Sequence, residues 1–324
     1  MYTIGIDLGG TNIAIGLCND ELRIIDKDSV PTLANRPGEE IVADMAALTK
    51  KIIERNGLSV EDIEYVGIAT PGTANSKSGV VEYANNLPFK NFPIAELFTK
   101  HLAVKKVIID NDANAAALGE ALAGAARNTQ SSVMITLGTG VGGGIVLDGK
   151  IFSGGLNCSG AEIGHTVISV GGRQCSCGRR GCFEAYSSAT ALTSFTKEKM
   201  NELELLGVDS LLFEEAEKEG KVSARTAFNA AKRGDVYGQR LVDDYITYLA
   251  AGITNVINVF QPEVVSIGGG VSGEGENLLA PLRKIVDLEQ YTRDNPVKTK
   301  VVKATLGNDA GIVGAAGLGK YVFE

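Results

Sequence analysis

The sequence has 324 residues but only five cysteines, two histidines and no tryptophan. It lacks the GxxxxGK[ST] pattern, which excludes a P-loop phosphate site. It also lacks a CxxC pair, which argues against a thioredoxin-like redox centre. The N-terminal stretch "MYTIGIDLGG" has neither a basic region nor a small-residue cleavage site, so we expect no signal peptide.

Positive charge and long apolar runs are also scarce. The chain has 31 basic and 39 acidic residues and a formal net charge of -8, so we expect no nucleic-acid partner. The longest uncharged run, residues 128–147, is rich in glycine, threonine and serine, and it predicts strand–turn–strand rather than a membrane span. We therefore expect a cytoplasmic protein without a membrane partner, in which clustered cysteines more often bind a metal than form disulfides.

Strand-like and helix-like segments alternate along the chain, which is typical of an α/β protein. Residues 2–26 and 132–154 each read as strand, Gly/Thr turn, strand, polar turn and strand. A repeat at this long period indicates a duplicated domain rather than a solenoid. We predict a small domain formed by residues 1–121 plus 303–324, to which the C-terminal helix returns, and a large domain formed by residues 122–302.

The first repeat contains "DLGGTN", a candidate phosphate-binding turn between two strands. Glycines let backbone N–H groups approach an anion closely, and Thr11 adds a hydroxyl donor. Asp7 is a candidate to orient Mg²⁺ through water. A plain β-hairpin turn is the alternative interpretation. The candidate residues here are Asp7, Gly9, Gly10, Thr11 and Asn12.

The second repeat contains "TLGTGVGGG", in which Thr139 and Gly140 occupy the aligned turn. So many glycines weaken a strand pair, and close approach of a ligand's phosphates is the favoured reason, with a glycine bulge as the alternative. A third cluster follows an apolar strand and would let a flat ring lie against the backbone: Gly268, Gly269 and Gly270. The arrangement resembles the actin-like ATPase fold, a ribonuclease H-like duplicated two-domain architecture that clamps ATP.

"DNDANAAALGE" places Asp112 at the end of a strand and just before a helix. One interpretation is an N-cap, because an aspartate satisfies free N–H groups there. The other is a general base that takes a proton from an attacking hydroxyl. The spacing alone favours the cap, and the two interpretations are compatible.

Three cysteines crowd into eight residues, in the pattern His165-x9-Cys175-x-Cys177-x4-Cys182. Cys₃His is an established tetrahedral Zn²⁺ set. We therefore predict a zinc site at these four residues. Cys18 and Cys158 have no such company and are interpreted as ordinary small residues.

"GAEIGHTVISVGGRQCSCGRRGCFEAYSSATAL", together with "IGIDLGGTN" and "DNDANAAALGE", resembles the ROK family of bacterial sugar kinases and related repressors over essentially the whole chain. The resemblance implies that Asp112 is the base for the sugar O6 hydroxyl and that the zinc is structural. It further implies sugar contacts at Gly72, Asn86, Asn111, Glu162, His165 and Glu184. The glycine clusters match the family's nucleotide site, and a homodimer or homotetramer is implied.

The implied activity is ATP- and Mg²⁺-dependent phosphorylation of glucose at O6, a glucokinase activity. N-acetylmannosamine, N-acetylglucosamine, fructose and mannose remain alternative substrates, because the motifs barely discriminate among them. Many relatives carry Glu at Asp110 and Trp at Phe89, and the second departure weakens any assignment of the sugar. A sugar-responsive repressor is an alternative from another class, but the first strand is expected to start by Thr3, which leaves no room for a helix-turn-helix domain ahead of it. A kinase-like sugar sensor without catalysis is a third alternative, against which Asp112 and the glycine turns argue.

Overall fold

The computed structural model describes residues 1–155 and 160–322. The contacts divide the chain into two compact units. The first unit comprises residues 1–134, 144–161 and 304–324, and the second comprises residues 135–143 and 162–303. The domain limits drawn from the sequence stay a prediction. Among the described residues, no helix combines the length and apolarity that crossing a bilayer requires.

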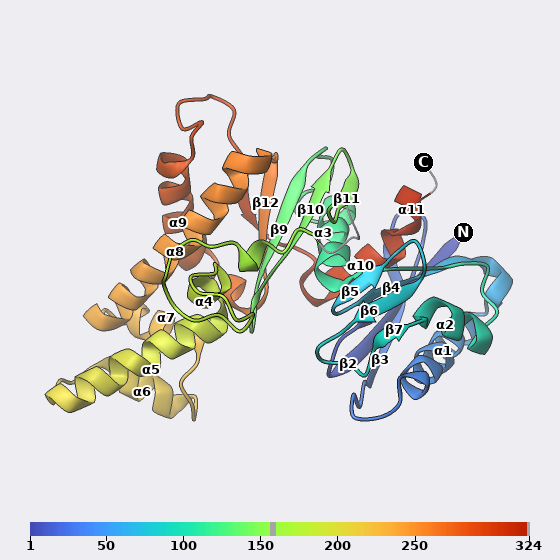
Figure 1. Ribbon diagram of the computed structural model, residues 1–324, viewed down its shortest axis with the longest axis horizontal. Helices are drawn as coiled ribbons and strands as arrows, with labels where there is room; N and C mark the ends of the chain where they lie inside the picture. Colours follow the sequence, from blue (N-terminus) through green and yellow to red (C-terminus); the bar gives the residue numbers. More distant parts are fainter. Residues whose placement is uncertain (156–159, 323–324) are drawn as a thin grey trace. The chain divides into compact units, whose positions relative to one another are not determined.

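The first unit is built on a five-stranded sheet with strand order β3-β2-β1-β4-β8 (Figure 1). Its strands are β1 (Tyr2–Leu8), β2 (Asn12–Cys18), β3 (Ile24–Pro31), β4 (Ile63–Thr70) and β8 (Val107–Asn111). β1, β2 and β3 run antiparallel, and β1, β4 and β8 run parallel. The carboxyl ends of β1, β4 and β8 therefore meet at one edge of the sheet, the usual position of ligands in such folds.

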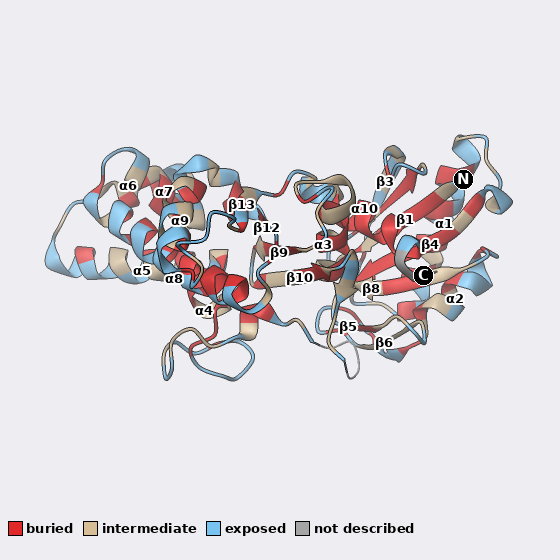
Figure 2. Cartoon of the chain, turned by 90° about the horizontal axis from the view of Figure 1, so that it is seen from above, coloured by how far each residue is buried: buried red, intermediate tan, exposed pale blue. Residues whose placement is uncertain are grey.

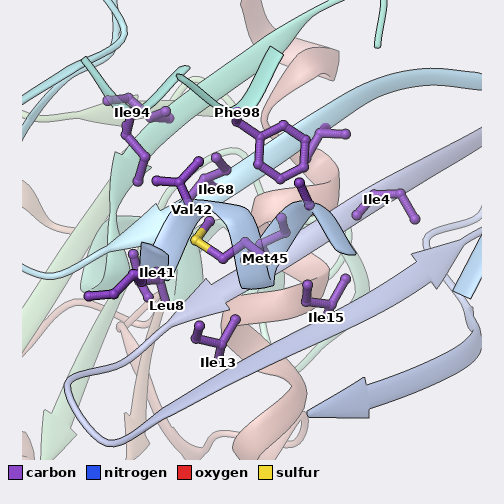
Figure 3. Close-up of a cluster of buried hydrophobic side chains, with 14 of the residues drawn as sticks. Ile4, Leu8, Ile13, Ile15, Ile41, Val42, Met45, Ile68, Ile94 and Phe98 are labelled. Carbon is purple, nitrogen blue, oxygen red and sulfur yellow. The ribbon is translucent and has the colours of Figure 1, made fainter. Parts of the chain in front are cut away.

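Alternation along β1 and β4 sends different side chains to the two faces of this sheet. Helices α1 (Gly38–Arg55) and α2 (Ile94–His101) cover one face. The apolar residues of α1 recur at helical intervals and pack on the strands. Figure 3 shows the resulting cluster, which includes Ile4, Leu8, Ile13, Ile15, Ile41, Val42, Met45, Ile68, Ile94 and Phe98. Figure 2 shows that β1 and β4 are largely buried.

The opposite face of the sheet is covered by α3 (Asp112–Ala123) and α10 (Ala310–Gly317). Gly5 and Gly67 face α10, and a Cβ added to them would lie 1.9 Å from the carbonyl oxygen of Ile312 and 1.8 Å from that of Ala315. Any side chain at these positions would therefore push α10 off the sheet. The small-residue sequence of α10 thus serves backbone-to-backbone packing.

The buried carboxylate of Glu120 secures the chain just before α10. It accepts hydrogen bonds from the backbone N–H groups of Ala125, Thr305 and Leu306, at 2.7, 2.9 and 2.7 Å. A buried charge is tolerated where several donors satisfy it. Glu120 thus joins the end of α3 to the segment that leads into α10.

A small sheet and three short helices also belong to the first unit. A three-stranded sheet of order β5-β6-β7 consists of β5 (Thr73–Asn75), β6 (Val80–Tyr83) and β7 (Lys90–Phe92). Phe89 lies in the core and stacks on Phe92 with ring centroids 4.4 Å apart. The remaining short helices are η1 (Val60–Asp62), η4 (Gly307–Asp309) and α11 (Gly319–Val322).

The second five-stranded sheet has the order β11-β10-β9-β12-β13, which repeats the order of the first. Its strands are β9 (Ser132–Leu137), β10 (Val141–Leu147), β11 (Lys150–Phe152), β12 (Val264–Gly268) and β13 (Lys300–Lys303). The matching order confirms the duplication predicted from residues 2–26 and 132–154. In the first sheet the glycine turn follows β1, and in the second sheet the aligned turn follows β9.

The second unit adds eight further helices in its described residues. These are η2 (Ile163–His165), α4 (Glu184–Ser187), α5 (Ala189–Leu206), α6 (Leu211–Lys218), α7 (Ala224–Lys232), α8 (Val236–Phe260) and α9 (Glu276–Glu289), with η3 (Gly270–Glu274) between β12 and α9. Asp235 caps α8 by accepting hydrogen bonds from the N–H groups of Tyr237 and Gly238, and it also binds Leu211 N–H at the start of α6.

The close contact of α10 with the sheet generates the first prediction. Gly67→Ala should lower the free energy of unfolding by about 3 kcal/mol. The atoms that the new Cβ would meet belong to the backbone of Ala315, so no change of rotamer relieves the clash. Gly273→Ala is the matched control, since an added Cβ meets no atom within 4 Å there. Urea unfolding followed by circular dichroism measures both. Equal effects of the two substitutions would contradict this packing argument.

Candidate active site

The first glycine turn, residues 9–12, joins β1 to β2 as a tight hairpin. Gly9 N–H donates to the carbonyl of Asn12 at 2.9 Å, and Thr32 Oγ1 donates to the carbonyl of Gly9 at 2.6 Å. Gly10 lies beside Asn86, because an added Cβ would be 3.3 Å from the Cβ of that residue. The turn is therefore both a β-hairpin and a partly exposed row of backbone groups next to a predicted sugar contact.

Asp7 lies on the α10 face of the sheet. A Cβ added to Gly311 would be 2.5 Å from Asp7 Oδ2, so the start of α10 closes over the carboxylate. Burial, and secondarily the charge of Asp112, raise the pKa of Asp7 to about 6. Asp7 and Asp112 thus form one electrostatic neighbourhood at the carboxyl edge of the first sheet.

Two more candidate residues lie at the same edge. Asn111 ends β8, and its Nδ2 donates to the carbonyl of Gly72 at 3.1 Å. Gly72 has φ +87, and an added Cβ would be 2.1 Å from the carbonyl oxygen of Tyr83, so this turn requires glycine. The fold therefore gathers Gly72, Asn111, Asp112 and Asp7 from segments far apart in sequence.

The N-cap of α3 is Asn111 and not Asp112. Asn111 Oδ1 accepts hydrogen bonds from the N–H groups of Ala113 and Asn114, at 2.9 and 3.3 Å. The capping interpretation of Asp112 is wrong, because Asp112 already has helical geometry as the first residue of α3. Its carboxylate accepts a hydrogen bond from Ala113 N–H at 2.8 Å and stands at the positive end of the helix.

Asp110 holds the junction between β8 and α3 through hydrogen bonds. Its Oδ1 accepts hydrogen bonds from Asn111 N–H at 2.7 Å and from Asn114 Nδ2 at 2.9 Å. Burial raises the pKa of Asp110, although these two hydrogen bonds oppose the shift. Asp110 therefore orders the residues on both sides of Asp112.

In the second unit, the four predicted metal ligands converge. One ligand atom from each of His165, Cys175, Cys177 and Cys182 lies within 4.8 Å of the others. The Sγ atoms of Cys177 and Cys182 are 3.7 Å apart, and Cys175 Sγ is 3.7 Å from His165 Nδ1. In a tetrahedral site with Zn–S bonds of about 2.3 Å, two sulfurs are about 3.8 Å apart. The donor set and its spacing fit Zn²⁺.

The backbone of the cysteine loop, residues 175–182, explains this convergence. Gly178 and Gly181 have φ +88 and +82, and a Cβ added to Gly181 would be 1.8 Å from the carbonyl oxygen of Ser169. Cys175 N–H donates to the carbonyl of Arg179 at 2.9 Å. The two glycines therefore let the loop double back and direct its sulfurs to one point. Cys18 is buried, and Cys158 lies outside the described residues.

Glu184 connects the cysteine loop to the second glycine turn, residues 138–140. Its Oε1 accepts from Ser176 Oγ at 3.0 Å and its Oε2 from Val141 N–H at 3.1 Å. Glu162 is exposed just before η2, and its carbonyl accepts His165 N–H at 3.0 Å. Because His165 Nδ1 faces the sulfurs, Nε2 is the ring nitrogen left for another partner.

Packing explains most glycines of "TLGTGVGGG". Added Cβ atoms would be 2.2 Å from Glu184 at Gly140, 2.7 Å from Ile163 at Gly143 and 2.5 Å from Ala117 at Gly144. Gly138 and Gly270 differ, because an added Cβ meets nothing within 4 Å. Open space for a ligand therefore adjoins Gly138 and Gly270. Gly269, with φ +80, packs on Leu137.

A cavity of about 570 Å³ opens beside these two glycines, a volume suited to a nucleotide-sized ligand. The second glycine turn and η3 form part of its lining. Sequence reasoning missed the rest of the lining, which includes Thr193, Lys221, Arg225, Phe228 and Glu274. These residues have no recognisable spacing, and all of them except Thr193 come after the segment 197–220. It contains the end of α5 and all of α6, with Leu203 and Leu212 buried.

Comparison with known proteins decides the family. The ROK family model matches residues 3–321. The chain belongs to the ROK family. It is 38% identical to a glucokinase of Thermotoga maritima over 318 residues, which covers 97% of this chain and 96% of the relative. A ROK family glucokinase from Streptomyces griseus, solved in complex with glucose and AMPPNP, is 32% identical, covers 98% and 99% of the two chains, and superposes with a TM-score of 0.78.

ROK membership confirms the actin-like ATPase fold expected from the duplicated glycine turns. The family also contains regulators. A xylose repressor of Caldicellulosiruptor bescii is 31% identical over 288 residues, which covers 89% of this chain and 70% of the repressor. Family membership and fold therefore leave the activity of this ROK protein to be argued from its site.

The buried carboxylate of Asp7 generates the second prediction. Its raised pKa means that the folded protein binds this proton more tightly than the unfolded chain does. The contribution of protonated Asp7 to the free energy of unfolding is therefore full at pH values below 3.8, the pKa of this residue in the unfolded chain. That contribution is lost as the pH rises through about 6, its pKa in the folded protein. Asp7→Asn keeps the side chain neutral and should raise the free energy of unfolding by about 2 kcal/mol at pH 8 without magnesium, and by little at pH 4.

Urea unfolding at the two pH values measures this difference. Asp294→Asn, which alters an exposed carboxylate, is the control and should change stability by less than about 0.5 kcal/mol at either pH. Asp7→Asn that destabilises the protein equally at pH 8 and pH 4 would refute the assignment.

Proposed function

We propose that this ROK protein is a glucokinase that transfers the γ-phosphoryl group of ATP to O6 of glucose. The observation that carries the proposal is Asp112, a partly buried carboxylate held at the start of α3, in a chain whose near-full-length relatives include glucokinases. The products are glucose 6-phosphate and ADP.

Asp112 is the general base of this reaction. Its carboxylate takes the proton of the O6 hydroxyl as that oxygen bonds to the γ-phosphorus, and the bond from the γ-phosphorus to the β–γ bridging oxygen breaks. Rigid placement matters, because a base must stay within hydrogen-bond reach of the hydroxyl. The Asn111 cap and the Asp110 hydrogen bonds provide that rigidity.

Asp7 and the two glycine turns serve the phosphates. Asp7 would hold Mg²⁺ through water, and the ion would neutralise the charge that develops on the phosphates during transfer. Asp7 has a pKa of about 6, so it is largely ionised at neutral pH and offers a negative charge near Asp112. We assign the 570 Å³ cavity to the adenosine part of ATP, because it adjoins the second glycine turn.

We assign binding of the sugar hydroxyls to polar side chains beside the cysteine loop of the second unit, and we take Asn111 of the first unit as a further sugar contact on the basis of the family resemblance. Glu162, Glu184 and the Nε2 atom of His165 supply acceptors and a donor for hydroxyl groups. Asn111 has one amide hydrogen left, because its oxygen caps α3 and its other hydrogen binds Gly72. Zinc bound by His165 and the three cysteines would fix the orientation of the imidazole.

We further infer a cytoplasmic homodimer or homotetramer, on the basis of the family resemblance. Another hexose remains the second candidate substrate, because no side chain described above distinguishes glucose from mannose, fructose or an N-acetylhexosamine. The relation to a xylose repressor supports a third candidate, a regulator that binds sugar without phosphorylating it.

A coupled assay of ADP release with Mg²⁺-ATP separates these candidates. Glucose should give the highest kcat/KM among glucose, mannose, fructose, N-acetylglucosamine and N-acetylmannosamine. Turnover with an N-acetylhexosamine but not with glucose would contradict the assignment of glucose as the substrate, while the proposed kinase chemistry would stand. No ADP with any sugar would overturn the enzyme and favour the regulator.

Asp112→Asn gives the sharpest test of the base. We expect kcat to fall by a factor of about 10²–10⁴, because the amide cannot accept the proton, while glucose still binds within a few-fold of the wild-type affinity. Kinetics and calorimetric titration with glucose measure the two effects. Asp209→Asn, at an exposed site, should leave both unchanged. Normal turnover by Asp112→Asn would show that another group is the base.

A further inference from the structure

Arg173 lies two residues before Cys175, where the chain enters the cysteine loop. Its Nη1 and Nη2 atoms donate to Oε1 and Oε2 of Glu198 at 2.8 and 2.6 Å, a bidentate pair. Its Cζ atom lies 4.1 Å from the ring centroid of Phe195. One side chain therefore joins the loop entrance to two residues of α5.

The backbone of Arg173 is held as firmly as its side chain. Its N–H donates to the hydroxyl oxygen of Tyr186 at 2.8 Å, and its carbonyl accepts Gly181 N–H at 2.7 Å. A Cβ added to Gly172 would be 2.0 Å from the Tyr186 hydroxyl, so the preceding position requires glycine. A displacement of Arg173 would consequently move the cysteine loop with it.

Helix α5 also holds the second glycine turn. At its first residue, Ala189 N–H donates to the carbonyl of Gly138 at 2.8 Å. Glu198 lies nine residues further along the same helix. A single rigid element thus contacts the turn assigned to phosphate at one end and the entrance of the cysteine loop further along.

These three elements line one cavity of about 680 Å³. Its lining includes Thr139 and Gly140 of the glycine turn, Cys175 and Ser176 of the loop, Ser194 and Phe195 of α5, and also Glu184 and Arg173. The width of this cavity is set by how far the loop stands from α5. The Arg173–Glu198 pair spans that distance.

We propose that Arg173 and Glu198 are positioning residues that fix the sugar-binding face of the cysteine loop against the phosphate-binding turn. Neither residue touches the reacting atoms. They act through the placement of His165 and Glu184, and this part of the argument rests on the proposed function.

The pair is well suited to a test, because its loss should not unfold the protein. The side chains of Arg173 and Glu198 are 43% and 52% exposed, and exposed ion pairs contribute little to global stability. The consequence of losing the pair should therefore appear in sugar binding and in retention of the metal rather than in the unfolding transition.

Three variants test the Arg173–Glu198 pair, each purified as the holoenzyme in buffer that contains zinc. Glu198→Ala should raise the KM for glucose about fivefold while kcat and the KM for ATP change less than about twofold. Glu198→Gln keeps one hydrogen bond to Arg173 and should fall between Glu198→Ala and wild type. The charge swap Arg173→Glu/Glu198→Arg should restore the KM to within about twofold of wild type.

A second readout does not depend on activity. Release of zinc to a chelator should be about threefold faster in Glu198→Ala, with the same zinc stoichiometry as wild type. Glu202→Ala is the matched control, because it removes a different ion pair of α5, with Lys199, and should change neither readout.

The outcomes separate the two proposals. An unchanged KM and an unchanged zinc-release rate in Glu198→Ala, or a charge swap as impaired as the single variant, would overturn the positioning role. A wild-type protein that turns over no glucose would overturn the proposed function, and the zinc-release rates alone would then decide the role of the pair. A wild-type protein that purifies without zinc would overturn the positioning role.

Discussion

The contact between α10 and the strands β1 and β4 is the constraint on which the first unit depends. It brings backbone against backbone, because Gly5 and Gly67 present no Cβ to the carbonyl groups of α10. The alternation that turns Gly5 toward α10 also turns Asp7 toward it, so the same packing that stabilises the sheet buries a carboxylate. The raised pKa of Asp7 is therefore a consequence of the core and not of the ligand site alone.

The two units carry different parts of the proposed chemistry. Each sheet presents a glycine turn after its first strand, and each unit adds something different. The first adds the β8–α3 junction with Asp112, and the second adds the cysteine loop with His165. The first unit thus presents a carboxylate suited to proton transfer. The second unit presents a group of potential metal ligands beside polar side chains.

Hydrogen-bond occupancy limits what the polar residues of the candidate site can do. Asn111 caps α3 and binds Gly72, and its second amide hydrogen has no partner among the described residues. Glu184 binds Ser176 and Val141, yet an ionised carboxylate has further acceptor sites for a hydroxyl. Residues that both shape the protein and face a ligand tolerate substitution poorly, since a change affects both roles.

Local spacing and motifs within short segments were enough to predict the α/β class, the duplication, the cysteine–histidine set and the resemblance that ROK membership confirms. The folded structure was needed to show that Asn111 rather than Asp112 caps α3, and that packing accounts for Gly140, Gly143 and Gly144 while open space adjoins Gly138. The folded structure also revealed the cavity residues Arg225 and Phe228 and the ion pair between Arg173 and Glu198. These features arise where segments distant in sequence come within a few ångströms of each other, and periodicity along the chain carries no record of such contacts.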